Sequence, residues 1–396
     1  MNDLFVLTAQ YSSNIYSPLA LAFAKGRGAK VWDVEDNNYI DCVSGFSVVN
    51  QGHCHPKIIK AFQEQSEKIT MVSRALYSDN LGKWEEKICS LANKEKVLPM
   101  NTGTEAIETA IKIARKWGTD VKGIADGEGE IIAMNGNFHG RTLGALSLSS
   151  QESYKQGFGP LLDNVHYTDF GDISHLKDLI NNNTTAIILE PIQGEGGVNI
   201  PPDDFIKEVR KLCDEHNVLF IADEIQVGLG RTGKMFAMEW EGVEPDIYLL
   251  GKSLGGGLYP ISAVLANHDV MDVLTPGTHG STFGGNPLAC AVSMAALDVL
   301  IEEQLIENSE KLGQKLLNEL QLIDSNIISD VRGRGLFIGL ELTEAAQSYC
   351  LEMIDKGVLC KETQGNIIRI APPLVINEQE IDQVISVITE VLEKDK

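Results

Sequence analysis

Four short apolar runs, each followed by polar or glycine-rich residues, constrain the fold of this chain more than any other feature. They cover residues 131–134, 186–189, 218–222 and 247–250. Unbroken runs of this length are typical of strands buried on both faces of a sheet, and a strongly periodic helix at 205–213 separates two of them. The sequence therefore predicts an α/β domain with a mostly parallel sheet, whose functional residues lie in loops at the carboxyl ends of the strands.

The last quarter of the chain has a different pattern. Periodic helices alternate there with strands, as in a smaller α+β domain, and residues 332–335 are interpreted as a turn. The expected helices and strands lie near 311–322, 345–356, 380–392, 336–342 and 367–370. We expect three parts, namely an N-terminal arm and hairpin packing with the small domain, a large domain, and the small C-terminal domain, at 1–46, 47–287 and 288–396.

Composition narrows the class of function. Among 396 residues, 33 are basic and 56 acidic, and the net charge of −23 argues against binding nucleic acid or an anionic membrane surface. The first residues lack the features of a secretory leader, and no apolar run could span a bilayer, so a cytoplasmic protein is expected. Seven cysteines without a C-x-x-C pair favour reduced thiols over a disulfide framework or a metal site.

Lys252 follows the fourth apolar run and precedes a turn with glycines at 255–257. A partly desolvated amine at the end of a buried strand can act as a nucleophile and bond covalently to an aldehyde cofactor. A solvated lysine is the simpler alternative. A phosphate-binding P-loop is excluded by spacing, because its first glycine would fall at Asp246. The lysine alone does not decide between a covalent role and a solvated one.

Asp223 comes directly after the third apolar run. A carboxylate in this position needs a cationic or hydrogen-bonding partner, and a protonated pyridine nitrogen would be suitable. A structural salt bridge would satisfy Asp223 equally well. Residues 228–233 match G-x-G-x-x-G, but no long periodic helix follows, and Ser253 stands where the ribose-binding acid is expected. We therefore do not predict a dinucleotide site.

Two further segments suit a flat phosphorylated ligand. Thr102 and Glu105 form a capping-box pattern at a helix start, where backbone N–H groups at Gly103 and Thr104 could bind a phosphate, although capping alone explains the pattern. Phe138 follows the first apolar run and could stack on a flat ring, with its nearby arginine able to hold a carboxylate. Each signal by itself is weak.

Together, a stacking aromatic residue, a carboxylate, a reactive lysine and a phosphate-binding helix start at successive strand ends describe a pyridoxal phosphate site. In such a site Asp223 would keep the pyridine nitrogen protonated, and Lys252 would move the substrate proton as general base and acid. In the C-terminal part, Arg369 sits in an apolar strand and needs an anionic partner.

Over nearly its whole length, the chain resembles the class III, fold-type I aminotransferases and, within that class, the ornithine aminotransferases. The resemblance implies a large domain that binds pyridoxal phosphate between helices on a seven-stranded type of sheet, with a smaller α+β domain. The motifs that carry it are at 50–56, 100–103, 137–138, 140–142, 190–194, 223–226, 250–252, 279–282, 368–369 and 371–374.

The resemblance also implies roles for individual residues. Gln226 would bond the ring hydroxyl of the cofactor and Phe138 would stack on its ring. Ser281 and Thr282 would complete the phosphate site of the partner subunit in a homodimer.

For the substrates, the resemblance implies that Arg141 and Arg369 receive carboxylates. Glu195 would pair with Arg369 while ornithine reacts and release it for 2-oxoglutarate. Tyr16 would place the α-amino end of ornithine. Phe46 departs from the tyrosine of some relatives, which removes one polar contact.

The function expected from the resemblance is transfer of the δ-amino group of ornithine to 2-oxoglutarate by a ping-pong route. Acetylornithine and 4-aminobutyrate aminotransferases are the nearest alternatives, since the first shares the lysine, aspartate and glutamine motifs. A nucleotide-binding oxidoreductase would need the loop at 228–233 to hold a dinucleotide. A non-catalytic binding protein is disfavoured by the presence of both Lys252 and Asp223.

Overall fold

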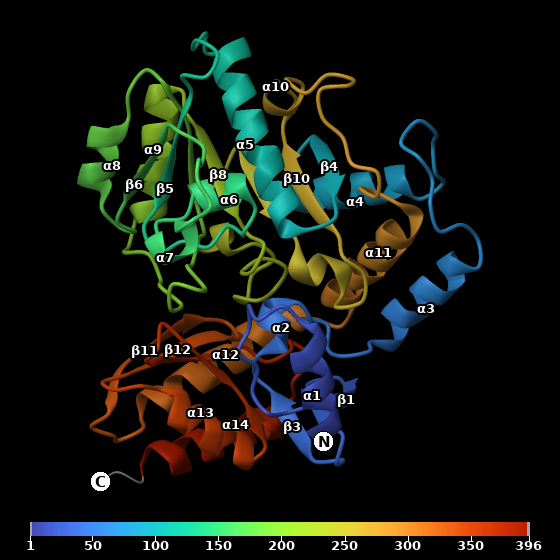
Figure 1. Ribbon diagram of the computed structural model, residues 1–396, viewed down its shortest axis with the longest axis vertical. Helices are drawn as coiled ribbons and strands as arrows, with labels where there is room; N and C mark the ends of the chain where they lie inside the picture. Colours follow the sequence, from blue (N-terminus) through green and yellow to red (C-terminus); the bar gives the residue numbers. More distant parts are fainter. Residues whose placement is uncertain (1, 394–396) are drawn as a thin grey trace.

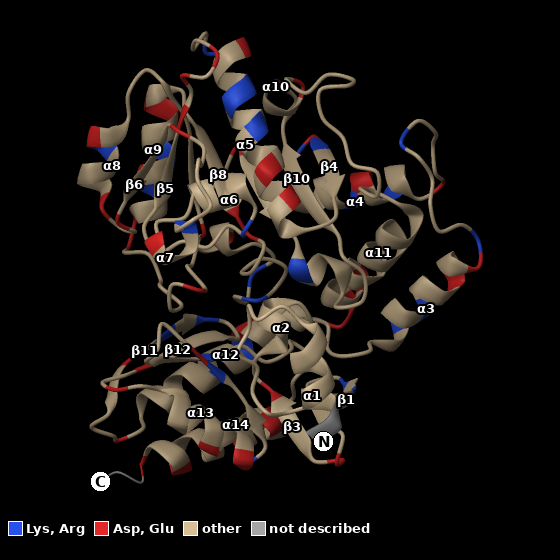
Figure 2. Ribbon diagram, in the orientation of Figure 1, with Lys and Arg blue, Asp and Glu red and all other residues tan. Residues whose placement is uncertain are grey.

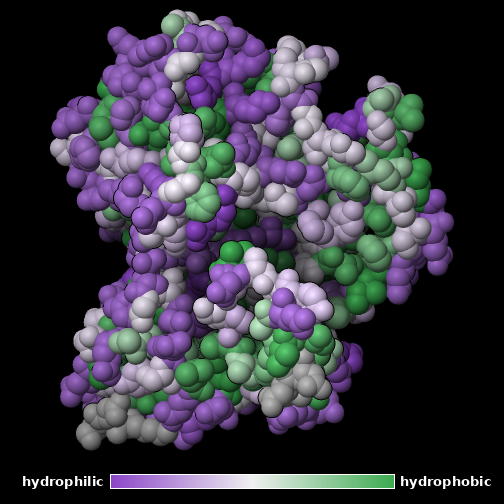
Figure 3. All heavy atoms as spheres, viewed as in Figure 1, coloured by the Kyte–Doolittle hydropathy of each residue, from purple (hydrophilic) through white to green (hydrophobic). Residues whose placement is uncertain are grey.

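A computed structural model of the chain describes residues 2–393 (Figure 1). One part of the molecule is built on a seven-stranded sheet with helices around it, and the other on two smaller sheets with their own helices. The first and last described helices, α1 (Asn2–Tyr11) and α14 (Glu378–Leu392), both lie in the second part (Figure 1). Between the two parts, the face seen in Figure 3 is hollowed across its middle.

The large sheet has the strand order β4-β10-β9-β8-β7-β5-β6. Its strands are β4 (Lys96–Met100), β5 (Glu130–Met134), β6 (Val165–Thr168), β7 (Thr184–Leu189), β8 (Leu219–Asp223), β9 (Ile247–Leu250) and β10 (Ser262–Ala266). Neighbouring strands from β9 to β6 pair in parallel, whereas β10 is antiparallel to both β4 and β9. The expected mostly parallel sheet is confirmed.

Helices cover both faces of this sheet, which explains why its central strands are apolar throughout. Successive residues of β5, such as Ile131 and Ile132, belong to different hydrophobic clusters on opposite faces. Helix α5 packs in one cluster, while α4, α9 and α11 pack in the other. The helices of this part are α3 (Pro56–Ser66), α4 (Leu81–Ala92), α5 (Gly103–Asp120), α6 (Leu143–Ser147), α7 (Glu152–Lys155), α8 (Ile173–Leu179), α9 (Phe205–His216), α10 (His268–Met271) and α11 (Pro287–Glu302), with short 3-10 helices η1 (Ala237–Trp240) and η2 (Lys252–Gly255).

The second part contains two four-stranded sheets, ordered β1-β2-β3-β13 and β11-β12-β15-β14. The N-terminal hairpin joins the C-terminal segment directly, because β3 pairs in parallel with β13. The division of the chain at residues 46 and 287 stays a prediction. The elements are α1 (Asn2–Tyr11), β1 (Phe23–Arg27), β2 (Lys30–Asp33), β3 (Asn38–Asp41), α2 (Ser44–Ser47), α12 (Leu305–Gln321), β11 (Ile328–Arg334), β12 (Phe337–Leu342), α13 (Gln347–Asp355), β13 (Val358–Leu359), β14 (Lys361–Thr363), β15 (Ile367–Ile370) and α14 (Glu378–Leu392).

The segment 332–335 was expected to form a turn, and this expectation is wrong for most of it. Arg332 and Arg334 lie in β11, paired with Gly339 and Phe337 of β12, and the hairpin turn is at Gly335 and Leu336. The arginines are satisfied within the fold, since Arg332 pairs with Asp330 and Glu341 and Arg334 with Glu241. Charged residues at a strand end, with glycines between them, resemble a loop in sequence although tertiary ion pairs hold them in a strand.

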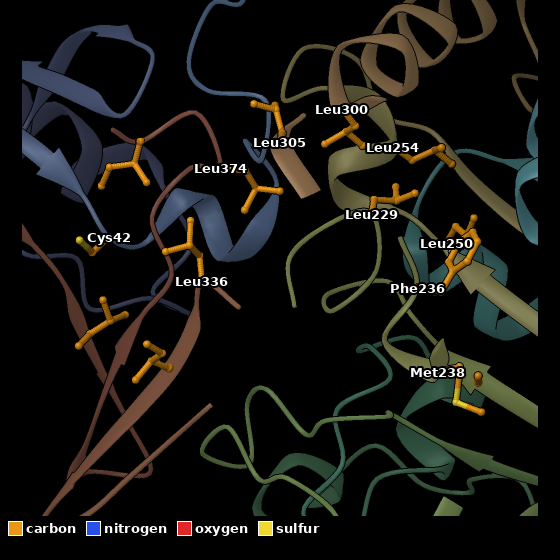
Figure 4. Packing of buried hydrophobic residues seen from close by; sticks show 14 of the residues in the cluster. Cys42, Leu229, Phe236, Met238, Leu250, Leu254, Leu300, Leu305, Leu336 and Leu374 are labelled. Atoms are coloured by element: carbon orange, nitrogen blue, oxygen red, sulfur yellow. The ribbon is translucent and has the colours of Figure 1, made fainter. Parts of the chain in front are cut away.

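The two parts share one hydrophobic core. Leu250 at the end of β9 and Leu336 before β12 belong to the same buried cluster, as do Leu229 and Leu374 (Figure 4). Residues 228–233 do not open a helix, because the next helical turn, η1, starts only at Ala237. The geometry of a dinucleotide-binding helix is therefore absent from this described segment.

Charged residues are spread over both parts in the view of Figure 2, with basic and acidic residues both marked along α5. Across residues 2–393, no helix has the length and apolar character that crossing a membrane requires. The same residues contain no group of three or more His, Cys, Asp or Glu side chains suited to hold a metal ion.

Candidate active site

Two adjoining cavities lie where β5, β7, β8 and β9 end and where α5 begins. The first, of about 200 Å³, has Lys252 and Asp223 in its wall. The second, of about 260 Å³, shares Thr102, Gly103 and Lys252 with the first. Because the strands are parallel, their carboxyl ends meet at one edge of the sheet and bring these loops together. The remaining lining of the first cavity is Thr104, Phe138, His139, Gly140, Glu190, Ile225, Gln226 and Val227.

Lys252 begins η2 directly beyond β9 and has a φ of 45°, a left-handed conformation that few side-chain-bearing residues adopt. Its surroundings disfavour the charged amine. Burial lowers the pKa of Lys252 to about 8, and the charges of Glu195 and Asp223 oppose this effect only in part. The amine is thus neutral far more often near neutral pH than an ordinary lysine, as a nucleophile requires.

Asp223 is buried at the end of β8 and has two hydrogen-bonding partners in the fold. His139 Nδ1 lies 2.7 Å from Asp223 Oδ2, and the backbone N–H of Ile225 donates to Oδ1 at 3.1 Å. Burial lowers the pKa of His139, but the hydrogen bond and charge of Asp223 raise it more, with a net upward shift. Asp223 therefore has the structural ion pair that was the alternative to a role in the site, with His139 as its partner, and it also lines the cavity.

The helix start at α5 has the predicted capping box. Thr102 Oγ1 accepts the N–H of Glu105 at 3.3 Å, and Glu105 Oε2 accepts the N–H of Thr102 at 3.1 Å. The N–H groups of Gly103 and Thr104 lie in the first turn, where a helix provides no acceptor for them. Both residues line the first cavity. A Cβ on Gly103 would come within 3.1 Å of Ile225, so glycine keeps this turn open to a ligand.

Arg369 has the anionic partner that its apolar strand requires. Its Nη1 lies 2.6 Å from Glu195 Oε1, which also accepts from Gln226 Nε2 at 3.4 Å. The guanidinium lies over the ring of Phe46, 4.8 Å from its centroid. Burial alone would raise the pKa of Glu195, but the charge and hydrogen bond of Arg369 bring it below its usual value. A carboxylate and an arginine are therefore paired beside Gln226, at the edge of the first cavity.

Seven of the predicted site residues do not line either of these two cavities. Three of them, Phe46, Glu195 and Arg369, form the group beside Gln226 described above, and the other four lie elsewhere. Tyr16 is 79% exposed, and Arg141 is exposed, with its guanidinium over the ring of Tyr154 at 3.5 Å and that of Phe138 at 5.6 Å. Ser281 Oγ accepts from Asn101 Nδ2 at 2.9 Å, beside the second cavity, and Thr282 is exposed. The fold of a single chain therefore leaves Tyr16, Arg141, Ser281 and Thr282 away from the cavity wall.

Two residues with a clear place in the site were not identified as site residues from the sequence. His139 stands between Phe138 and Arg141, and its contact with Asp223 joins residues 84 apart in the chain. Glu190 follows β7 directly, and its carboxylate accepts the N–H of Phe138. Burial raises the pKa of Glu190 to about 7. In the sequence, only the position of His139 and Glu190 after buried strands indicated a role in the site. That position does not specify which residues they contact.

The lining fits the pyridoxal phosphate expected from the sequence. An amine that can bond an aldehyde and a buried carboxylate suited to a ring nitrogen face one cavity, beside Phe138 and the free N–H groups of a helix start. His139 Nε2 is buried without a hydrogen-bond partner among the described residues. The cavity wall therefore contains a polar atom whose hydrogen bond the folded chain does not supply.

The family model for class-III aminotransferases matches residues 11–392. The chain belongs to the class-III aminotransferases. This class-III aminotransferase is 80% identical over 394 residues to ornithine aminotransferase 1 of Staphylococcus saprophyticus, with 100% of both chains covered.

Solved structures give the same family. An ornithine aminotransferase from Toxoplasma gondii has a TM-score of 0.98 at 41% identity, covering 100% of this chain and 96% of the other. An acetylornithine aminotransferase from Elizabethkingia anophelis has a TM-score of 0.90 at 44% identity, covering 99% and 98%. The class-III fold of the chain is thereby established.

Proposed function

We propose that this chain uses pyridoxal phosphate to transfer the δ-amino group of L-ornithine to 2-oxoglutarate, giving glutamate 5-semialdehyde and glutamate. The observation that carries the proposal is the convergence of Lys252 and Asp223 on one cavity, beside the Glu195–Arg369 pair. The 80% identity to a protein named for this activity supports ornithine as the donor.

Bound pyridoxal phosphate supplies an aldehyde that receives the amino group and a ring that accepts electrons. Lys252 holds the cofactor covalently between turnovers. Once released, its amine takes a proton from the aminated carbon of the substrate and later returns it. Asp223 keeps a proton on the ring nitrogen, and the bond from His139 orients its carboxylate for that purpose.

Other lining residues position the ring and the phosphate. Phe138 stacks on the ring, and Gln226 bonds its hydroxyl group. The N–H groups of Gly103 and Thr104 bind the phosphate, helped by the positive end of the α5 dipole.

The Glu195–Arg369 pair explains how one pocket accepts two different substrates. The δ end of ornithine carries no carboxylate, so Arg369 needs Glu195 as its counterion while ornithine reacts. When 2-oxoglutarate binds, its carboxylate takes the place of Glu195 at the guanidinium. Arg141 binds the other carboxylate, and Tyr16 places the α-amino end of ornithine.

The working form is a homodimer in which Ser281 and Thr282 reach the phosphate site of the partner subunit. Both lie outside the cavity of their own chain, and the neighbouring Phe283 is 55% exposed. An exposed phenylalanine beside two site residues suits a surface that a second subunit covers. The seven free cysteines suit a reducing compartment, so we place the enzyme in the cytoplasm.

Acetylornithine is the second candidate donor, because the chain is 44% identical to an acetylornithine aminotransferase of the same fold. The two donors differ only in the charge and size at the α-amino group. The test is kcat/KM for ornithine, N-acetylornithine and 4-aminobutyrate with 2-oxoglutarate as acceptor. Ornithine is expected to be at least tenfold better than either, since the loss of one charged contact costs about this much. A higher value for N-acetylornithine would assign the chain to the second activity.

The cofactor and its attachment need a separate experiment. Borohydride reduction of the purified protein, followed by peptide mapping, is expected to place the label on Lys252. A label on another lysine, or a colourless protein that binds NAD, would contradict the assignment.

A further inference from the structure

Glu190 is the first residue beyond β7, and its two carboxylate oxygens bond to two different loops. Oε2 accepts the backbone N–H of Phe138 at 3.1 Å, and Oε1 accepts that of Gly194 at 3.4 Å. The side chain is 6% exposed and forms part of the wall of the first cavity. One buried carboxylate therefore bridges the loop after β5 and the loop after β7.

Each of these loops carries a residue of the proposed site. The first carries Phe138, which faces the cavity, and the second carries Glu195, directly after Gly194. Gly194 packs closely against Gln226, because a Cβ built on Gly194 would lie 1.6 Å from the side-chain oxygen of Gln226. A shift of the Gly194 peptide would thus move Glu195 against Gln226 and alter its contact with Arg369.

The two loops have one other direct side-chain tie. Gln193 Nε2 donates to the backbone carbonyl of Asn135 at 2.7 Å. This bond reaches the first loop at Asn135, three positions before Phe138. Glu190 is the tie that reaches the peptides of Phe138 and Gly194 themselves. Its contacts are with backbone groups, so it acts through the positions of other residues.

We propose that Glu190 is a positioning residue that holds Phe138 and Glu195 in a fixed relation, so that the cofactor ring and the carboxylate-binding pair are aligned by one side chain. This rests on the proposed function. It predicts that removing both acceptors of Glu190 disturbs two sites together, the ring site and the Arg369 site. A buried carboxylate that only stabilises the fold would disturb neither site selectively.

The chain offers a matched control in Glu224. This carboxylate is 1% exposed, follows β8 and also accepts two backbone N–H groups, those of Ala237 and Met238 at 2.9 and 2.8 Å. It does not line the two cavities. Substitution to Met keeps the approximate volume and removes both acceptors at either position, so Glu190→Met and Glu224→Met carry a similar structural cost.

The experiment compares the two variants with the wild-type protein in three measurements that need no turnover. These are the dissociation constant of pyridoxal phosphate, the binding of glutarate to the loaded protein, and the thermal midpoint. Both variants are expected to unfold at lower temperature. Glu190→Met is expected to raise the dissociation constants of pyridoxal phosphate and of glutarate each by about tenfold or more. Glu224→Met is expected to raise either constant by less than about threefold.

Equal effects of the two variants, or a Glu190→Met protein in which only one or neither ligand binds more weakly, would overturn the proposal. If Glu190→Met is not recovered folded, Glu190→Gln replaces it. Its amide oxygen can accept from only one of the two N–H groups, so at least one ligand is expected to bind about tenfold more weakly, and unchanged binding of both would overturn the proposal. The ornithine assay on wild-type protein decides the proposed function independently of these comparisons.

Discussion

Arg369 Nη1 lies 2.6 Å from Glu195 Oε1, although the arginine belongs to β15 of a four-stranded sheet and the glutamate to the loop after β7 of the seven-stranded sheet. The Arg369 side chain is 7% exposed and that of Glu195 is 35% exposed, and each is the main charge partner of the other. A pair of this kind is stable while it is intact and unfavourable when one member is lost. A ligand carboxylate that replaces Glu195 can therefore bind strongly.

Glu195→Gln keeps the shape of the side chain and removes the charge that neutralises Arg369. We expect glutarate to bind about tenfold more tightly, and the ratio of kcat/KM for ornithine to that for glutamate to fall by about tenfold or more, because the guanidinium then needs an external anion. Half-reaction kinetics and glutarate titration measure both effects. Glu152→Gln, at a side chain 86% exposed, is the control. An unchanged donor ratio would show that the pair does not govern substrate choice.

The pKa of Lys252, lowered by burial to about 8, predicts how quickly cofactor-free protein captures pyridoxal phosphate. Only the neutral amine attacks an aldehyde, so the capture rate should rise about tenfold per pH unit below pH 8 and level off above it. Stopped-flow absorbance between pH 6 and 10 measures this rate. Lys252→Ala should lack the covalent phase at every pH. A rate that continues to rise to pH 10 would mean that the amine titrates as an ordinary lysine.

Asp223→Asn retains the shape of the side chain but cannot hold a proton on the ring nitrogen by charge. We expect turnover to fall by about a hundredfold or more, while borohydride still fixes the cofactor to Lys252. Asp246→Asn is the control, because Asp246 precedes β9 at the opposite end of the sheet and pairs with Arg210 at 2.8 Å. Loss of activity equal in both variants would indicate a general loss of stability.

Subunit mixing tests whether Thr282 acts in the site of the partner. Lys252→Ala lacks the reactive amine, and Thr282→Val weakens the phosphate site, so each homodimer should have little activity. Random exchange of subunits makes about half of the dimers mixed, each with one intact site, and should restore about a quarter of the wild-type activity. Activity of the mixture equal to the average of the two separate proteins would contradict a shared site.

Much of the fold followed from local patterns because these patterns report burial. The capping box at Thr102 and Glu105 predicted the start of α5, and the apolar runs predicted β5, β7, β8 and β9. The turn expected at Arg332 and Arg334 was wrong, since both residues pair with β12 in a strand, with their charges met by Glu341 on β12 and by Glu241 in the large part. Local sequence does not contain the position of such partners.

For the candidate site too, the sequence indicated some residues and left their partners unknown. Lys252 and Asp223 could be selected from the sequence, because each follows a buried strand and parallel strands present their ends at one edge of a sheet. The partners of these residues could not be selected. The bond from His139 to Asp223 and the bridge from Glu190 to two loops depend on which strands are neighbours and on how their loops fold.

The sequence by itself determined which segments are buried and the class of the fold, and it supplied the residues proposed to carry the chemistry, since hydrophobic periodicity and side-chain chemistry are local properties. Only the tertiary structure decided that Arg369 pairs with Glu195, that His139 holds Asp223, and that Tyr16, Arg141, Ser281 and Thr282 do not line the two cavities of their own chain. Such contacts join residues distant in the chain, and their energies depend on distance and burial, which exist only once the chain has folded.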